Sequence, residues 1–308
     1  MTEPLIHPTT LPNDLSPDRL RLRPAANGNV AVDAGIAGWR YLAFRTVMLA
    51  SGDSIEVGDG DHETAIVSLF GGDLTVARPG TADEILRGRP TVFDGLPSAY
   101  YLPAGRTATI AVSTPGSDST IAIATAPSRP RISADLRPMS IGRDDVRVEV
   151  RGAGRATRQI NHIIAPDFPA DRLLLVEVLT PAGNWSSWPP HKHDIDDMPN
   201  EAVLEEVYHY RFRRPEAWAV QRVYRPAGGP LGPARDAIFA VCDGEVVMVT
   251  DGYHPFAATD ADDAYYLNVL AGDRRTMACS FDPALDDVRE RWASMTPDPR
   301  VPFGESVS

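Results

Sequence analysis

Short apolar runs separated by turn residues make up most of the first half of the chain. Helical periodicity is nearly absent there, and steps such as Gly71-Gly72, Asp94-Gly95 and 103–105 separate the runs. Closely spaced runs with such turns predict an antiparallel sandwich or barrel rather than alternating strands and helices. The predicted strands are 41–49, 54–57, 64–70, 73–77, 91–93, 99–102, 107–112 and 119–125.

A second series of runs follows a Pro- and Arg-rich stretch at 126–145, which we interpret as an inter-domain connector. Apolar residues three and four apart near the C-terminus, Leu285, Val288 and Trp292, predict one short helix packed on this half. Two all-β halves of similar size predict a duplicated architecture, with domains at 1–145 and 146–308. The predicted strands of the second series are 146–150, 173–179, 206–212, 219–224, 236–241, 245–249 and 265–270.

Composition narrows the class of protein. The 308 residues are 43% hydrophobic and 23% charged, which suffices for a sizeable core, and the formal net charge is -12. This charge argues against a nucleic acid or an anionic membrane as partner. No run approaches the roughly 18 apolar residues of a membrane span. Only two cysteines, Cys242 and Cys279, and a start without a secretory pattern predict a cytoplasmic location.

The chemistry is concentrated between residues 183 and 255. His191 and His193 are two apart in an extended segment, so alternation aims both imidazoles to one side. A strand beginning Glu205-Glu206 follows, and alternation lets only one of these carboxylates face inward without deciding which. His254 lies in a later glycine-led turn. Three imidazoles and one carboxylate form a ligand set for a divalent transition metal with open positions for catalysis.

A structural interpretation competes with this metal site. His191 and His193 could be loop histidines capped by Asp194 and Asp196, with His254 supporting a tight turn. The order His-x-His, strand-initial glutamate and Gly-x-His favours the metal. The remaining histidines lack accompanying ligands or fall on the opposite strand face, and we leave them out of the ligand set: His7, His62, His162 and His209.

These motifs follow the cupin pattern, and the chain more closely resembles the 5-deoxy-glucuronate isomerase family, which is related to the 5-keto-4-deoxyuronate isomerases. The resemblance covers nearly the whole chain. The motifs that carry it are 180–194, Leu204-Glu-Glu-Val-Tyr-His-Tyr-Arg, Gln221-Arg-Val-Tyr, Gly252-Tyr-His-Pro, 265–272, Gly38-Trp-Arg-Tyr and Val92-Phe-Asp-Gly-Leu-Pro.

The resemblance implies a bicupin, two double-stranded β-helix barrels of which only the second keeps a metal. It also favours Glu206 as ligand, because the related isomerases place the ligand glutamate directly before a Val-Tyr pair. Zinc is the implied metal, with manganese or iron as alternatives, and a homo-oligomer is expected by analogy. Two departures from the family are Thr250-Asp251, where Pro-Arg is usual, and a long Gly/Pro-rich loop at 225–235 that is either a plain surface loop or a lid.

The implied reaction converts 5-deoxy-D-glucuronate to 5-dehydro-2-deoxy-D-gluconate in myo-inositol catabolism. We hypothesise that the metal polarises the carbonyl and the neighbouring hydroxyl, with either a proton relay through an enediolate or a hydride shift. The alternatives are an isomerase for another acidic sugar, an iron-dependent cupin dioxygenase or a sugar-binding cupin without turnover.

Candidates for contact with the small acidic sugar are weaker than the metal ligands, because packing explains each of them equally well. Arg222 suits a carboxylate, and its neighbour Gln221 falls on the opposite strand face, so only one of the two enters the barrel. Tyr208 shares a face with Glu206. The last candidates lie on the strand after His254 and are Tyr265 and Asn268.

Overall fold

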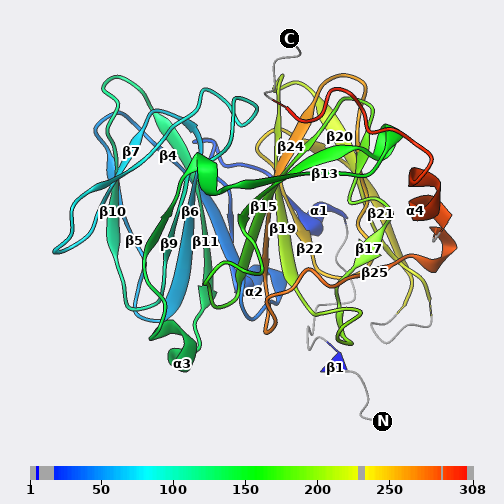
Figure 1. Cartoon of the computed structure of the whole chain (residues 1–308), viewed down its shortest axis with the longest axis horizontal. Coiled ribbons are helices and arrows are strands. Elements are labelled where there is room, and N and C mark those ends of the chain that lie inside the picture. The colour runs from blue at the N-terminus through cyan, green and yellow to red at the C-terminus, as the bar shows by residue number, and fades with distance from the viewer. Residues whose placement is uncertain (1–4, 7–16, 228–232, 286, 304–308) are drawn as a thin grey trace.

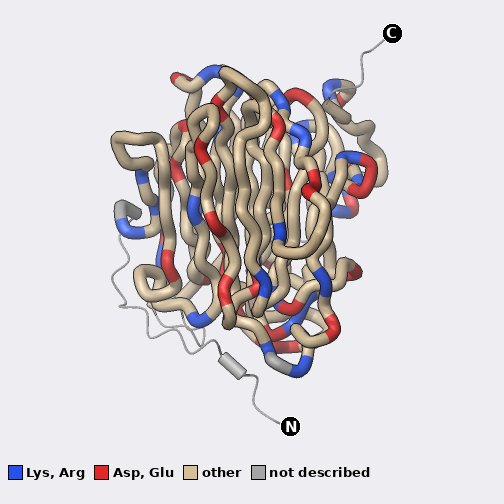
Figure 2. The backbone as a smooth tube through the Cα atoms, turned by 90° about the vertical axis from the view of Figure 1, so that its left-hand side faces the viewer, with Lys and Arg blue, Asp and Glu red and all other residues tan. Residues whose placement is uncertain are grey.

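The computed structural model describes residues 5–6, 17–227, 233–285 and 287–303. Two halves lie side by side, and each consists of one large and one four-stranded antiparallel sheet (Figure 1). The two large sheets face each other at the centre of the molecule, and the two small sheets lie outside. Acidic and basic positions are intermixed along the backbone in the view of Figure 2.

The first half comprises two sheets. The large sheet has the order β12 (Met139–Ile141), β9 (Ala99–Leu102), β6 (His62–Gly71), β11 (Ser119–Pro127), β4 (Ala43–Leu49), β3 (Ala31–Val32). The small sheet has the order β5 (Ser54–Val57), β10 (Ala108–Val112), β7 (Leu74–Ala77), β8 (Glu84–Leu86).

The second half repeats this plan with one more strand. Its large sheet has the order β13 (Arg147–Arg151), β14 (Arg158–Ile164), β15 (Leu173–Thr180), β24 (Ala264–Ala271), β19 (Glu205–Phe212), β22 (Val246–Val249), β2 (Arg21–Leu22). Its small sheet has the order β16 (Trp185–Ser186), β23 (Phe256–Ala258), β20 (Trp218–Arg225), β21 (Arg235–Cys242).

The remaining elements are short. Two-stranded pairs join β1 (Leu5–Ile6) to β18 (Ile195–Asp196) and β17 (His191–Lys192) to β25 (Ser280–Phe281). The helical elements are α1 (Pro17–Leu20), α2 (Ala34–Ala37), α3 (Pro130–Ser133), η1 (Arg143–Asp145), η2 (Gly154–Ala156), η3 (Pro283–Leu285) and α4 (Asp287–Trp292). Because β2 pairs with β22, residues 21–22 pack on the second half although they fall within the predicted first domain.

Most predicted strands are confirmed to within a few residues, and α4 confirms a short C-terminal helix. The prediction of a strand at 91–93 is wrong. The Thr91 hydroxyl accepts a hydrogen bond from the Phe93 amide and donates one to the Asp94 carboxylate, and these residues form a turn. The connector prediction is wrong in part, because 126–145 also contains the end of β11, helix α3 and strand β12.

The sequence did not predict strand β14 (Arg158–Ile164), because its residues form neither an alternating polar and apolar pattern nor a continuous apolar run. All seven of its residues are buried, and both faces of the strand carry polar side chains, so that polar and apolar residues do not alternate. Gln159 and Asn161 are the polar members on one face, where Asn161 bonds Glu177 at 3.2 Å beside the first half. A polar face that is buried between two halves cannot be recognised from a solvent-exposed one by sequence alternation alone.

Two buried carboxylates join the halves in a reciprocal manner. Glu63 on β6 accepts the backbone N–H groups of 171–173 at 2.6–2.8 Å. Glu205 on β19 accepts those of 40–42 at 2.7–2.9 Å. Each side chain thus satisfies backbone donors at the start of a strand of the opposite half, β15 for Glu63 and β4 for Glu205. Glu205 therefore points toward the first half, and alternation turns Glu206 into the second.

Candidate metal centre and its cavity

Two loops carry the histidines to the same end of the second half. The Lys192 ammonium ion pairs with Asp194 at 2.7 Å and with Glu201 at 2.8 Å, which fixes the first loop. Asp194 accepts the Gly252 amide at 2.8 Å and so ties this loop to the turn of His254. Gly252 has φ +81°, and a Cβ there would lie 2.4 Å from a backbone oxygen, so the turn requires glycine.

Three ligand atoms converge at this point. The relevant side-chain atoms of His193, Glu206 and His254 all lie within 4.8 Å of one another, and all three residues are buried. Glu206 Oε2 is 2.8 Å from His193 Nε2 and 3.2 Å from His254 Nε2. Each Nδ1 contacts a backbone oxygen, that of Leu204 at 2.9 Å and that of Gly252 at 3.0 Å. This leaves the two Nε2 atoms facing the carboxylate, the arrangement of metal-ligating histidines with outer-shell support.

The fit to a metal rests on a poorly satisfied atom. His254 Nε2 is fully buried and forms no hydrogen bond among the described residues, although Glu206 Oε2 lies 3.2 Å from it. A buried polar atom without a well-aligned hydrogen bond is costly, and a metal ion between the two atoms would satisfy both. The donor set of two imidazoles and one carboxylate also matches the preferences of divalent transition metals.

His191 lies next to this group but outside the tight cluster. Its ring centroid is 4.6 Å from that of His254 and 6.4 Å from that of His193. Burial, and then the neighbouring His254, hold its pKa well below the usual value. Its imidazole is therefore neutral at physiological pH and offers a lone pair toward the same space.

The carboxylate of the cluster is ionised. Burial alone would favour its neutral form, but the adjacent His193 and His254 outweigh burial and lower the pKa of Glu206 to about 2. The amide of Asn268 donates to its second oxygen, Oε1. The centre therefore presents an oriented anion among imidazole nitrogens.

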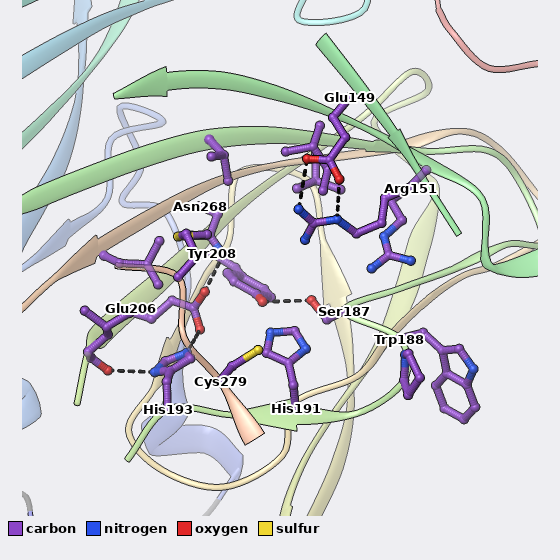
Figure 3. Close-up of a pocket in the computed structure, with 18 of the residues that line it drawn as sticks. Glu149, Arg151, Ser187, Trp188, His191, His193, Glu206, Tyr208, Asn268 and Cys279 are labelled. Carbon is purple, nitrogen blue, oxygen red and sulfur yellow. Dashed lines mark hydrogen bonds and ion pairs between the residues drawn. The ribbon is translucent and has the colours of Figure 1, made fainter. Parts of the chain in front are cut away.

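A cavity of about 450 Å³ adjoins the cluster (Figure 3). Tyr208 and Asn268, both expected at the site, line it. The Tyr208 hydroxyl is 2.8 Å from the Ser187 hydroxyl, and its ring stacks on Tyr266 at 4.5 Å. Sequence reasoning missed much of the remaining wall, which includes Glu149, Arg151, Arg158, His162, Trp188, Tyr266, Cys279, Arg289 and Trp292.

Several of these lining residues belong to the missed strand β14. Arg158, Ile160 and His162 alternate along it and all line the cavity. His162, which was left out of the predicted ligand set, is buried and lies 2.8 Å from a Glu149 carboxylate oxygen. The period-two spacing of these side chains was the available signal, and it required the strand to be recognised first.

Three expected contact residues lie elsewhere. Arg222 is on the outer face of β20, paired with Asp236 at 2.7 Å, which corrects its expected role toward a substrate carboxylate. Tyr265 faces the first half and donates to Glu177 at 2.7 Å, because alternation gives the cavity its neighbour Tyr266. Gln221 points inward, yet its amide bonds the backbone oxygen of His254 at 2.9 Å and supports that turn rather than lining the cavity.

The unusual Thr250-Asp251 step has a clear structural setting. Asp251 is buried and forms ion pairs with both Arg225 and Arg235, the residues that flank the long loop. The two departures from the family pattern are therefore in contact with each other. Residues 228–232 of the loop lie outside the described residues, as does the expectation of a lid.

The KduI/IolB family pattern matches residues 20–288. The chain belongs to the KduI/IolB family. A protein named 5-deoxy-glucuronate isomerase from Geobacillus kaustophilus (strain HTA426) is 38% identical over 269 residues, 87% of this chain and 93% of that protein. The protein of the same name from Bacillus subtilis (strain 168) is 35% identical over 253 residues, 82% and 89% of the two chains. The predicted family is confirmed, and the protein is an isomerase.

Solved structures agree on the fold. An IolB-like protein from Salmonella typhimurium LT2 has a TM-score of 0.78 at 32% identity and covers 88% of this chain and 99% of its own. An oxalate decarboxylase from Lactobacillus farciminis has a TM-score of 0.56 at 12% identity, covering 85% and 88%, a likeness of fold alone. The two-barrel cupin architecture is thereby confirmed. Among the described helices, none has the length and apolar character that crossing a membrane requires.

Proposed function

We propose that this member of the KduI/IolB family is a metal-dependent aldose-ketose isomerase that converts 5-deoxy-D-glucuronate to 5-dehydro-2-deoxy-D-gluconate in myo-inositol catabolism. The observation that carries the proposal is the convergence of His193, Glu206 and His254 beside a cavity of about 450 Å³. That volume is in the usual range for small-molecule sites. The relatives named for this reaction cover most of the chain and support the choice of substrate.

We infer that His193, Glu206 and His254 hold a divalent metal, with His191 as the fourth ligand. Zinc is the first candidate for this nitrogen-rich set, and manganese and iron are alternatives. When bound, such an ion supplies Lewis acidity to the carbonyl and hydroxyl oxygens of a sugar.

The chain's own residues orient the reactants. The amide of Asn268 holds the Glu206 carboxylate in one orientation. The hydroxyls of Tyr208 and Ser187, 2.8 Å apart, form a polar pair that can donate to a sugar oxygen. The ring of Trp188 on the cavity wall offers an apolar face to the sugar carbons and excludes water from that side.

We place the reaction in the cytoplasm. The chain of 308 residues has two cysteines, and both Cys242 and Cys279 are free. Free thiols and the absence of a disulfide framework fit a reducing compartment.

Metal analysis of the purified protein, coupled to an assay with 5-deoxy-D-glucuronate, tests the proposal. We expect His193→Ala to lose the metal and to lower turnover more than about a hundredfold, because removal of an imidazole ligand weakens metal affinity. His62→Ala is the matched control: this half-buried histidine of the first half pairs with Asp59, and the variant should retain metal and turnover. Normal turnover in His193→Ala would refute the metal mechanism.

Two further measurements separate the alternatives. Release of the label from the migrating position into water supports a proton relay, whereas complete retention supports a hydride shift. Full turnover without oxygen is expected of an isomerase, and oxygen consumption on addition of substrate would instead identify a dioxygenase.

A further inference from the structure

Arg158 occupies a distinctive place in the cavity wall. It begins β14, opposite Arg151 on β13, and shares the cavity face of its strand with Ile160 and His162. Its side chain is 5% exposed. A guanidinium with so little access to water requires compensation from neighbouring groups.

The protein supplies little of that compensation. Arg158 Nη1 donates to the Ala156 oxygen at 3.0 Å, and the guanidinium lies 5.8 Å from the centre of the Trp292 ring. A guanidinium has five N–H donors. Among the residues that the structure describes, no carboxylate forms an ion pair with it. Burial accordingly lowers the pKa of Arg158 to about 10, which still leaves it protonated at neutral pH.

The carboxylates of the cavity are already engaged. Glu149 binds Arg151 through both oxygens, at 2.7 and 2.9 Å, and also contacts His162. Glu206 belongs to the histidine cluster. Because Glu149 binds it, Arg151 already has a counter-charge. Arg289, the third arginine of the wall, is exposed and lies 4.7 Å over the Phe281 ring.

We propose that Arg158 binds the carboxylate of the acidic sugar and thereby selects sugar acids over neutral sugars. A carboxylate would accept from the free N–H donors and supply the missing counter-charge in a low-dielectric setting. It would enter on the β14 side of the cavity, so that the sugar chain extends toward the histidine cluster. This assignment rests on the proposed function for the sugar, but the charge argument requires only an acidic ligand.

The test compares 5-deoxy-D-glucuronate with 5-deoxy-D-glucose, in which a hydroxymethyl group replaces the carboxylate. Calorimetry on the metal-loaded protein gives the binding preference for acid over neutral sugar. Arg158→Gln should lower affinity for the acid about 10- to 100-fold, the usual effect of losing a charged hydrogen-bond partner, and leave the neutral sugar within about twofold. In the isomerase assay, the weaker binding of the acid should raise KM and leave kcat nearly unchanged.

Matched variants separate the contribution of Arg158 from those of other arginines. Arg222→Gln removes an arginine from the outer face and should keep the preference; Arg289→Gln removes the rim arginine and should also keep it. Metal content and the thermal midpoint report on folding. If Arg158→Gln does not fold, Arg158→Lys, which keeps the charge but not the planar fork, should lower the preference at least about threefold.

An unchanged preference in the folded Arg158 variants overturns the assignment, as does a preference that disappears only with Arg289→Gln. A wild-type protein that binds both sugars equally well also overturns it. A wild-type protein that prefers the acid through Arg158 but does not isomerise it refutes the proposed function alone.

Discussion

The two large sheets place different chemistry at corresponding positions. Glu63 and Glu205 perform the same capping task, and they lie opposite Ala126 and Ala271 in the same register. Counting from them, Thr64 corresponds to Glu206, Ile66 to Tyr208 and Ile123 to Asn268.

The interiors differ accordingly. In the first half, Ile66 and Ile123 belong to an apolar cluster that includes Leu74, Tyr100 and Ile110. In the second half, the apolar cluster fills one part of the interior, and the histidine cluster with its cavity takes the other. One scaffold thus supports a packed core in one copy and a polar site in the other. The shared parts of the scaffold are the strand order and the interface between the halves.

The largest expected effect comes from making the second half resemble the first. Glu206→Thr places the residue of position 64 in the cluster and removes its anion. We expect the metal to be lost and kcat/KM to fall more than about a thousandfold. Elemental analysis and the isomerase assay measure both quantities. Retention of metal and activity would show that the carboxylate is not a ligand.

A smaller effect is expected from opening the packed interior of the first half. Ile66→Ala should lower the free energy of unfolding by about 2–5 kcal/mol, because it removes buried methyl groups and leaves a cavity. Denaturant titration measures this change. Metal content and kcat of the folded variant should stay within about twofold of wild type, and a selective loss of kcat would connect the first interior to the reaction.

The smallest effect is expected where the halves are alike. Glu63→Gln and Glu205→Gln each weaken three charge-assisted bonds to backbone amides, so each should cost about 1–3 kcal/mol of unfolding free energy. The backbone contacts of the two caps are equivalent, and Glu63 also accepts the Tyr101 hydroxyl at 2.6 Å. We therefore expect both costs to fall in this range, with metal retained in both variants. Metal loss in Glu205→Gln alone would break the equivalence and reopen the choice between the adjacent glutamates.

Much of this organisation follows from local sequence. Turn residues and alternating runs predict most strands, because both depend on conformational preferences of adjacent residues. The motif of His191 and His193 and the turn of His254 were recognisable for the same reason. Strand alternation also predicted correctly that only one residue of each adjacent pair points into the barrel. The two pairs are Glu205/Glu206 and Gln221/Arg222.

Tertiary structure decided which residue of each pair that is. Glu205 turns away from the cluster because the amides of 40–42, distant in sequence, need its oxygens. Tyr265 points away from the cavity because its hydroxyl donates to Glu177, which lies beside the first half. Arg158 escaped prediction because the polar residues between it and His162 are buried against the other half rather than exposed. Local alternation therefore determines that two faces exist, and only long-range packing determines what each face meets.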